Sequence, residues 1–346
     1  MTEQLKLKLN DSKATRWGAL VIVAFTMMAA YYVNDVVAPL KTMLETDLAW
    51  SSTDFGFFTG GYSFLNVFFL MLIWGGLILD RFGIRFTGKL ATILMVGGTA
   101  LEYYAMTGLA GADATLFGIN EIFGYKTGVF VAFAGYSIFG VGAEVAGITV
   151  SKIIAKWFKG KELATAMGVQ VALARIGSQA GYAVAIPLAR AFGISTPVLL
   201  GLVLLLGGMI AFFIFAVMDK KLDKQMEAAA IAAGTEDEEE KFSFKDVKNI
   251  LVNPGFWLIA LLCVLFYSCV FPFQKFASEL MIIKYGINEN VAGTFAGLPA
   301  LGALILTPVF GGFIDKRGKS ASIMLLGSAM LICVHFIYAI PDINYW

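Results

Sequence analysis

The sequence GLILDRFGIR occupies residues 76–85, and a related sequence, GGFIDKRGK, occupies residues 311–319. Both contain a glycine, an aspartate four residues later, and a second glycine three residues after the aspartate. These residues are Gly76, Asp80 and Gly83 in the first stretch and Gly311, Asp315 and Gly318 in the second. Each stretch follows a long apolar segment and precedes another. The same spacing at matching places indicates that the chain contains two related halves.

The residue types of the first stretch predict a structural role for each position. We expect Gly76 to let neighbouring helices pack closely and Gly83 to form a tight turn between two helices. Asp80 is expected to cap a helix N-terminus and to pair with an arginine. Arg81 and Arg85 belong to the same loop. The second stretch repeats the aspartate and both glycines, so we expect the same roles there.

The composition places most of the chain in a lipid environment. Of its 346 residues 58% are hydrophobic and 15% are charged, whereas soluble domains have about 25% charged residues. A helix needs about 20 apolar residues to cross a bilayer. Nine segments meet this requirement: roughly 17–39, 53–79, 86–108, 126–150, 162–190, 196–218, 254–284, 291–314 and 321–340. The sequence therefore predicts an all-α polytopic membrane protein.

The positions of the basic residues predict its orientation. If the nine spans alternate in direction, most of the 26 lysines and arginines fall on one side, which we call the basic side. It contains the N-terminal tail and the segments that follow the second, fourth, sixth and eighth spans. Because positively charged loops stay in the cytoplasm, we expect this side and the N-terminus to be cytoplasmic.

One long polar segment divides the chain. It covers residues 219–253 and includes the acidic run EDEEE at 236–240, which is typical of a solvated linker. We therefore predict a six-helix bundle over residues 1–218, a cytoplasmic linker over 219–253 and a three-helix partial bundle over 254–346.

Charged residues within the spans are the main candidates for a functional site, because burying a charge in a membrane is costly. Arg175 lies near the middle of the fifth span, and Glu144 lies in the basic-side half of the fourth. Side chains lean toward the N-terminus of their helix, so these two can meet, either as a structural ion pair or as a binding site. Asp35 lies near the end of the first span, where it is either a site residue or a hydrated helix cap. Tyr267 on the seventh span either offers its hydroxyl to the site or serves only in packing.

Two charges on the seventh span allow a simpler interpretation. Lys275 and Glu279 are one turn apart and are expected to pair with each other. Pro272 beside them interrupts the hydrogen bonding of the helix, as in helices that bend.

The pattern G-x-x-x-D-R-x-G-x-R at residues 76–85 resembles the signature loop of the major facilitator superfamily, which acts there as a cytoplasmic latch between two halves. The resemblance implies the major facilitator fold, with twelve spans in two six-helix halves. Nine spans are visible, so we expect the second half to be truncated in this chain.

Several stretches are similar to the lysosomal dipeptide transporter branch of that superfamily. They are WFKGKEL at 157–163, ARIGS at 174–178, VFPF at 270–273, KYG at 284–286 and GVGAE at 140–144. The resemblance implies that Glu144 and Arg175 are the intramembrane acid and base of the family. An arginine fork for a carboxylate and an acid for an amine complement a dipeptide, which is a zwitterion.

The chain departs from these families in two ways. Tyr136 stands where many proton-driven antiporters carry an arginine on the fourth span, which argues against proton antiport of that kind. The N-terminal tail contains no acidic dileucine signal, so a lysosomal address and an accessory subunit do not carry over. We expect a monomer in a prokaryotic inner membrane.

The leading hypothesis is a transporter that moves dipeptides or similar zwitterions by alternating access. One alternative is an organic-anion transporter in which Arg175 binds the anion and Glu144 only holds Arg175 in place. The other is a non-transporting membrane receptor or scaffold. The sequence contains no metal-ligand cluster, nucleophile motif or cofactor fingerprint, so we expect neither an enzyme nor a cofactor. The expected partners are a small-molecule substrate and the bilayer, without nucleic acid.

Overall fold

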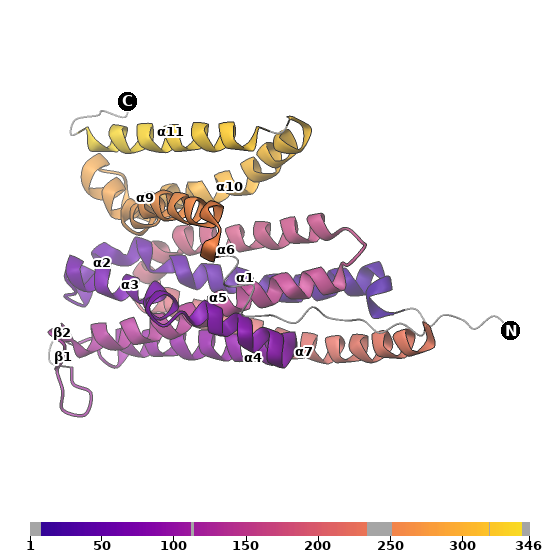
Figure 1. Ribbon diagram of the computed structural model, residues 1–346. Coiled ribbons are helices and arrows are strands. Elements are labelled where there is room, and N and C mark those ends of the chain that lie inside the picture. Colours follow the sequence, from indigo (N-terminus) through magenta and orange to yellow (C-terminus); the bar gives the residue numbers. More distant parts are fainter. Residues whose placement is uncertain (1–7, 112–113, 234–250, 318, 341–346) are drawn as a thin grey trace.

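The computed structural model describes residues 8–111, 114–233, 251–317 and 319–340, without the side chains of 229–233, 308, 311–312, 314–316 and 320. The long helices lie side by side in a layered bundle (Figure 1). They are α1 (Lys13–Val36), α3 (Ser52–Phe68), α4 (Met71–Thr107), α5 (Thr127–Trp157), α6 (Leu163–Phe192), α7 (Thr196–Ala233), α9 (Pro254–Tyr285), α10 (Glu289–Arg317) and α11 (Ser320–Ala339).

The remaining elements are short. They are the 3-10 helices η1 (Leu9–Asp11) and η2 (Ala38–Leu40), the helix α2 (Lys41–Asp47), and the strands β1 (Glu121–Ile122) and β2 (Tyr125–Lys126). The two strands form a small antiparallel hairpin in which Glu121 pairs with Lys126. The hairpin lies between α4 and α5 at the end of the bundle opposite the N-terminus (Figure 1). The described part of the chain is therefore almost entirely helical, as predicted.

The predicted second and third spans differ in detail from the structure. The segment predicted as one helix over 53–79 breaks between α3 and α4, which are bent by 58°. Leu70 at the break has a left-handed φ of 52°. The helical path of α4 is interrupted at Gly83, whose φ of 74° suits a residue without a side chain. The predicted turn at Gly83 therefore lies inside α4, and α4 combines the end of the second span with the third.

Six of the described helices are long and apolar enough to cross a membrane, and α3 with α4 would add a seventh as a bent pair. α7 continues to Ala233, into the segment predicted as a linker. Residues 234–250, with the acidic run, lie outside the described residues. The division of the chain into three parts remains a prediction.

The core lies among the N-terminal helices α1 to α7, and α9 to α11 are attached to one side of it (Figure 1). Several pairs of helices approach closely because glycine leaves room for the neighbouring backbone, and α4 with α5 and α1 with α6 are two of them. A Cβ atom at Gly98 of α4 would lie 2.5 Å from the carbonyl oxygen of Gly135 in α5. A Cβ at Gly177 of α6 would lie 2.1 Å from the carbonyl oxygen of Met28 in α1.

We expect Gly98→Ala to destabilise the protein by about 1–3 kcal/mol, because backbone atoms on both sides leave no room for a methyl group. The matched control is Gly97→Ala, since a Cβ at Gly97 meets nothing within 4 Å. In a helix interior that change should be neutral or stabilising by about 0.5–1 kcal/mol. Melting temperatures in detergent measure the difference. Equal stability of the two variants would contradict the packing described for α4 and α5.

Candidate functional site

The predicted site residues gather around a tyrosine of α1. Tyr31 interacts electrostatically with Arg175, Glu144, Asp35 and Tyr267. The guanidinium carbon of Arg175 lies 5.7 Å from the centre of the Tyr31 ring, which is a cation–π geometry. Four helices thus supply one polar cluster: α1, α5, α6 and α9. We call these five residues together with Tyr62 the central cluster.

Arg175 and Glu144 do not form an ion pair with each other among the described side chains. The hydroxyl of Tyr62 on α3 instead donates a hydrogen bond of 2.8 Å to Oε1 of Glu144. α1, which carries Tyr31, packs against both α5 and α6, and Tyr31 interacts with both charges. Instead of the direct contact considered from the sequence, the structure therefore has an acid and a base that share one neighbouring tyrosine.

In this arrangement a guanidinium and carboxylates lie around one tyrosine, and Arg175 is not paired with Glu144. A guanidinium free of a carboxylate partner can take a bidentate anion, and Glu144 can accept from an ammonium group. Tyr31, Asp35, Tyr62, Glu144 and Arg175 are all partly exposed, in contrast to the fully buried residues around them. The cluster therefore has the chemistry of a site for a small zwitterion.

Tyr267 brings the C-terminal helices to the same cluster. It lies on α9, is 48% exposed, and stacks on Phe271 one turn later with ring centres 4.9 Å apart. The packing role and the site role that the sequence left open for Tyr267 are both compatible with this position.

Lys275 of α9 lies next to Asp35 rather than next to Glu279. Its ammonium nitrogen is 3.8 Å from Oδ1 of Asp35, and it donates hydrogen bonds to the carbonyl oxygen of Asn34 at 2.6 Å and to the hydroxyl of Tyr136 at 3.1 Å. The predicted pairing of Lys275 with Glu279 is therefore wrong. The reason is that Lys275 faces α1 and α5, where it finds several acceptors.

Glu279 faces a different neighbour, Lys41 at the start of α2. The Lys41 side chain is only 2% exposed and forms ion pairs with Glu45 and Glu279. Arg190 at the end of α6 pairs with Glu289 and donates a hydrogen bond of 2.9 Å to Asn290, both at the start of α10. These contacts join the N-terminal helices to α9 and α10 at the end away from the basic side.

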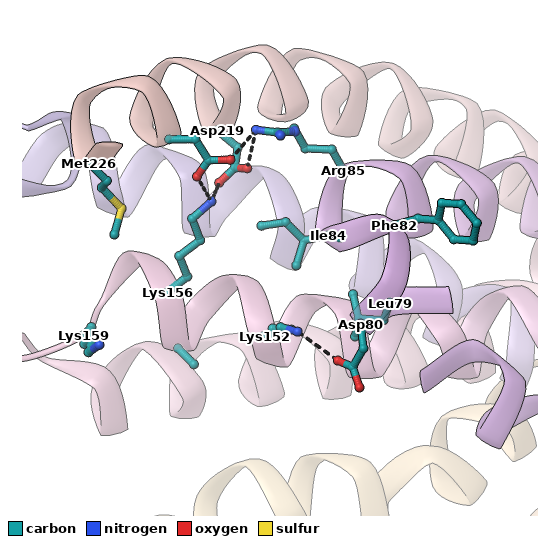
Figure 2. Close-up of a pocket in the computed structure, with 13 residues that line it drawn as sticks. Leu79, Asp80, Phe82, Ile84, Arg85, Lys152, Lys156, Lys159, Asp219 and Met226 are labelled. Carbon is teal, nitrogen blue, oxygen red and sulfur yellow. Dashed lines mark hydrogen bonds and ion pairs between the residues drawn. The ribbon is translucent and has the colours of Figure 1, made fainter. Parts of the chain in front are cut away.

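The signature loop lies at the opposite end, on the basic side. There, a cavity of about 590 Å³ is lined by residues of α4, α5 and α7 (Figure 2). Asp80 pairs with Lys152 of α5 at 3.0 Å, so its partner is a lysine and not the predicted arginine. Arg81 lies over the ring of its neighbour Phe82, with 5.5 Å to the ring centre.

Arg85 reaches from α4 to two acids of α7, as Figure 2 shows, and lies 3.4 Å from Oδ2 of Asp219.

The predicted packing role of Gly76 is wrong, because a Cβ there would meet nothing within 4 Å. Its neighbour Gly75 has that role, since a Cβ there would lie 2.6 Å from Val145 of α5. A shift of one residue along a helix rotates the side chain by about 100° and changes the helix face.

The second copy of the loop is described only in part. Gly311 and Asp315 lie on α10, but their side-chain positions lie outside the described part of the structure, and Gly318 lies outside the described residues. Their predicted role as a second latch remains a prediction.

Asp219 is the most buried acid of this cavity, and we expect Asp219→Asn to destabilise the protein by about 3 kcal/mol. Its side chain is 0% exposed and accepts from Lys156 at 2.8 Å and from the Trp157 indole nitrogen at 3.0 Å. Asp223 contacts the same bases but is 40% exposed, so Asp223→Asn should cost less than about 1 kcal/mol. Thermal unfolding in detergent compares the two. A larger effect for Asp223 would contradict the arrangement.

The N-terminal tail is held to the α5–α6 loop by ion pairs that depend on pH. Lys161 donates a hydrogen bond of 2.6 Å to Asp11, and this contact, with a backbone hydrogen bond from Lys8, holds the pKa of the Asp11 carboxyl below its ordinary value. Arg16 lowers the pKa of Glu162 in the same way, at 2.7 Å. Because the pKa values of these two carboxyls are lowered, their ion pairs stabilise the tail fully at pH values above the ordinary carboxyl pKa. This stabilisation is lost as the pH falls through the lowered pKa values.

We therefore expect hydrogen exchange at residues 9–16 to be slow and constant from about pH 5 upward and to accelerate, relative to the intrinsic rate, below about pH 4. Lys161→Met should give the faster exchange already at neutral pH. Exchange that stays equally protected down to pH 3 would contradict this account of the tail.

A family model described as "Major Facilitator Superfamily" matches residues 18–346. The chain belongs to the Major Facilitator Superfamily. The match covers nearly all described helices, from α1 to α11. The protein is accordingly an integral, multi-pass membrane transporter with this all-helical fold, and it is not an enzyme.

Curated relatives and solved structures of the superfamily agree with this assignment. The chain is 27% identical over 347 residues to the lysosomal dipeptide transporter MFSD1 of Homo sapiens, an alignment that covers 96% of this chain and 68% of the relative. It is 31% identical over 225 residues to the protein of the same name from Gallus gallus, covering 61% and 49%. The branch resemblance seen in the sequence is therefore confirmed as a distant relationship.

The structural neighbours show the fold alone. A D-xylose–proton symporter superposes with a TM-score of 0.56 at 15% identity, over 87% of this chain and 69% of the neighbour. A partially occluded inward-open conformation of the xylose transporter XylE from E. coli superposes with a TM-score of 0.58 at 16% identity, over 88% and 74%.

Sequence reasoning missed Tyr31 and Tyr62 as members of the central cluster. Tyr31 lies one turn before Asp35, so its place on the same helix face could have been read from the spacing. Tyr62 could not, because its partner Glu144 lies on another helix. A tyrosine in an apolar segment is also usually a packing residue, so the sequence does not distinguish Tyr62 from the other aromatic residues of the chain.

Proposed function

We propose that the protein transports dipeptides or similar small zwitterions by alternating access, with the central cluster as the substrate site. The observation that carries the proposal is that Arg175 and Glu144 both neighbour Tyr31 but are unpaired with each other. In this proposal Arg175 binds the substrate carboxylate and Glu144, held by Tyr62, accepts from the substrate amine. The names of the curated relatives support a dipeptide as the first candidate.

The two ends of the molecule supply the parts that alternating access requires. At the end away from the basic side, Lys41, Glu279, Arg190 and Glu289 hold the N-terminal helices against α9 and α10. On the basic side, we propose that the Asp80 and Asp315 loops form the latch. Rocking of the two parts would break one set of contacts while the other forms, and the central cluster would open to each side in turn.

The test is uptake of a labelled dipeptide into proteoliposomes that contain the protein. We expect saturable uptake, and counterflow when unlabelled dipeptide is present inside. Competition separates the substrate classes: free dipeptides should compete strongly, and amino-blocked peptides and dicarboxylates weakly. Strong competition by amino-blocked peptides or dicarboxylates would favour an organic-anion transporter. Binding without flux would indicate a receptor, and absence of both would overturn the proposal.

We further propose that the basic side faces the cytoplasm and that the protein acts as a monomer in a cell membrane. The distribution of lysines and arginines supports the orientation. Labelling of single cysteines placed on the N-terminal tail, in intact cells and in inverted vesicles, tests it directly.

A further inference from the structure

Glu102 of α4 is a buried acid that the proposed function does not use. It is 0% exposed, and neither of its carboxylate oxygens has a hydrogen-bond partner among the described residues. An ionised carboxylate buried without a donor is very costly, whereas a protonated carboxyl costs far less. The arrangement therefore fits a Glu102 that holds a proton in this conformation.

The nearest charge that acts on Glu102 among the described residues belongs to Lys275 of α9. Among the described residues, Lys275 is the one charged side chain that interacts electrostatically with Glu102, and Tyr136 of α5 is the neighbouring titratable hydroxyl. Lys275 in turn interacts with two acids, Asp35 and Glu102. In this structure Lys275 forms its salt bridge with Asp35, with 3.8 Å between the ammonium nitrogen and Oδ1. One cation thus serves two acids, one of which belongs to the central cluster.

We propose that Glu102 is a proton-binding site whose proton is released when a substrate amine displaces Lys275 from Asp35, so that the protein exchanges one proton for each substrate. The proposal rests on the proposed function. The O–H bond of Glu102 breaks and its proton goes to water on the open side. The Glu102 carboxylate then pairs with the Lys275 ammonium, and Asp35 joins Glu144 in binding the substrate ammonium.

The reverse steps complete the exchange on the other side of the membrane. When the substrate leaves Asp35, Lys275 returns to it and Glu102 takes up a proton from the water on that side. At each stage Glu102 is either protonated or paired, and Lys275 and Asp35 each have a partner of opposite charge, which avoids leaving any of these three as an isolated ion in the membrane interior. Because Lys275 lies on α9 and both acids lie on N-terminal helices, movement of α9 relative to these helices would change the partner of Lys275.

The first test is transport driven by a pH difference across proteoliposomes. One-for-one exchange of a proton for a neutral zwitterion moves one charge, so the membrane potential is held at zero with potassium and valinomycin. Under that condition an interior more acidic by one pH unit should accumulate dipeptide about tenfold, since one pH unit corresponds to a tenfold ratio. Glu102→Gln keeps the shape of the side chain and should lose this accumulation while retaining counterflow within about twofold. The control is Glu121→Gln, an exposed acid of β1, which should behave as the wild type.

These outcomes separate the two proposals. Counterflow by the wild type without pH-driven accumulation would overturn proton exchange and leave dipeptide transport standing, as would undiminished accumulation by Glu102→Gln. No counterflow by the wild type would overturn the proposed function instead.

A second measurement decides the role of Glu102 without any substrate. Infrared difference spectra of the purified protein between about pH 7 and pH 10, a range in which ordinary exposed carboxyl groups stay ionised, should contain the C=O stretch of a protonated carboxylic acid, and this band should be missing from Glu102→Gln. The melting temperature of the variant shows whether it is folded. A band of equal size in a folded Glu102→Gln protein, or no such band in the wild type, would overturn the assignment.

Discussion

Replacing Arg175 with alanine is expected to reduce dipeptide uptake, measured as the ratio of maximal rate to half-saturation concentration, by about ten- to a hundredfold. Hydrogen bonds to a charged group are worth about 1.5–3 kcal/mol, which corresponds to that range. The structure favours a large effect because Arg175 has no carboxylate partner among the described residues, so its charge is available to the substrate. Proteoliposome uptake at graded dipeptide concentrations gives the measurement.

Two further variants show whether the effect of Arg175 is specific. Arg175→Lys keeps the charge but loses the planar fork, so it should have an intermediate rate. Lys220→Ala removes an exposed base of α7 and should leave uptake unchanged. If Arg175→Ala were correctly folded and took up dipeptide at the wild-type rate, Arg175 would have no part in the site.

The second large effect is expected at Lys41, which joins α2 to α9. Removing one member of a buried ion pair costs about 3–5 kcal/mol because the other charge is left without a partner. Lys41→Met should therefore weaken the contact with Glu279 and shift the balance toward conformations in which this end is open. A change of about 3 kcal/mol alters the ratio of two conformations by more than a hundredfold.

Distances between spin labels at Thr46 and Ile283 report this opening, in a protein whose three cysteines have been replaced. Both positions are exposed, and they lie on α2 and α9. Arg190→Ala is the comparison. The side chains of Arg190 and Glu289 are both about 40% exposed, so loss of this ion pair should change the ratio of the two conformations by less than about fivefold. Identical distance distributions for wild type and Lys41→Met would show that the pair does not hold this end closed.

The helices of this protein could be predicted well from the sequence because the membrane requires long apolar segments and leaves few alternatives. The turn at Gly83 could be predicted for the same reason, since charges and a glycine interrupt the apolar pattern. The break between α3 and α4 could not. Residues 67–75 read VFFLMLIWG, which is apolar throughout and contains no proline or charge at the bend.

The site shows the same contrast. Arg175, Glu144 and Asp35 could be found because a charge in an apolar span is conspicuous. Their partners could not, since the choice of partner depends on how helices cross. Lys275 illustrates this: the sequence offers Glu279 one turn away, but the structure places Lys275 against Asp35 on another helix. Glu102 meets the same criterion, because it is a charge within the predicted span 86–108, and it could have been found in this way. The absence of a donor around it, however, is revealed only by the packing of α4.

The most direct test of the account is an experimental density map of the protein saturated with a dipeptide. We expect density for the peptide between α1, α5, α6 and α9, with its carboxylate on Arg175 and its amine near Glu144 or Asp35. The same map with Arg175→Ala should show this density lost or much weakened. Peptide density at another place, with the central cluster unoccupied and unchanged, would contradict the central claim that these residues form the substrate site.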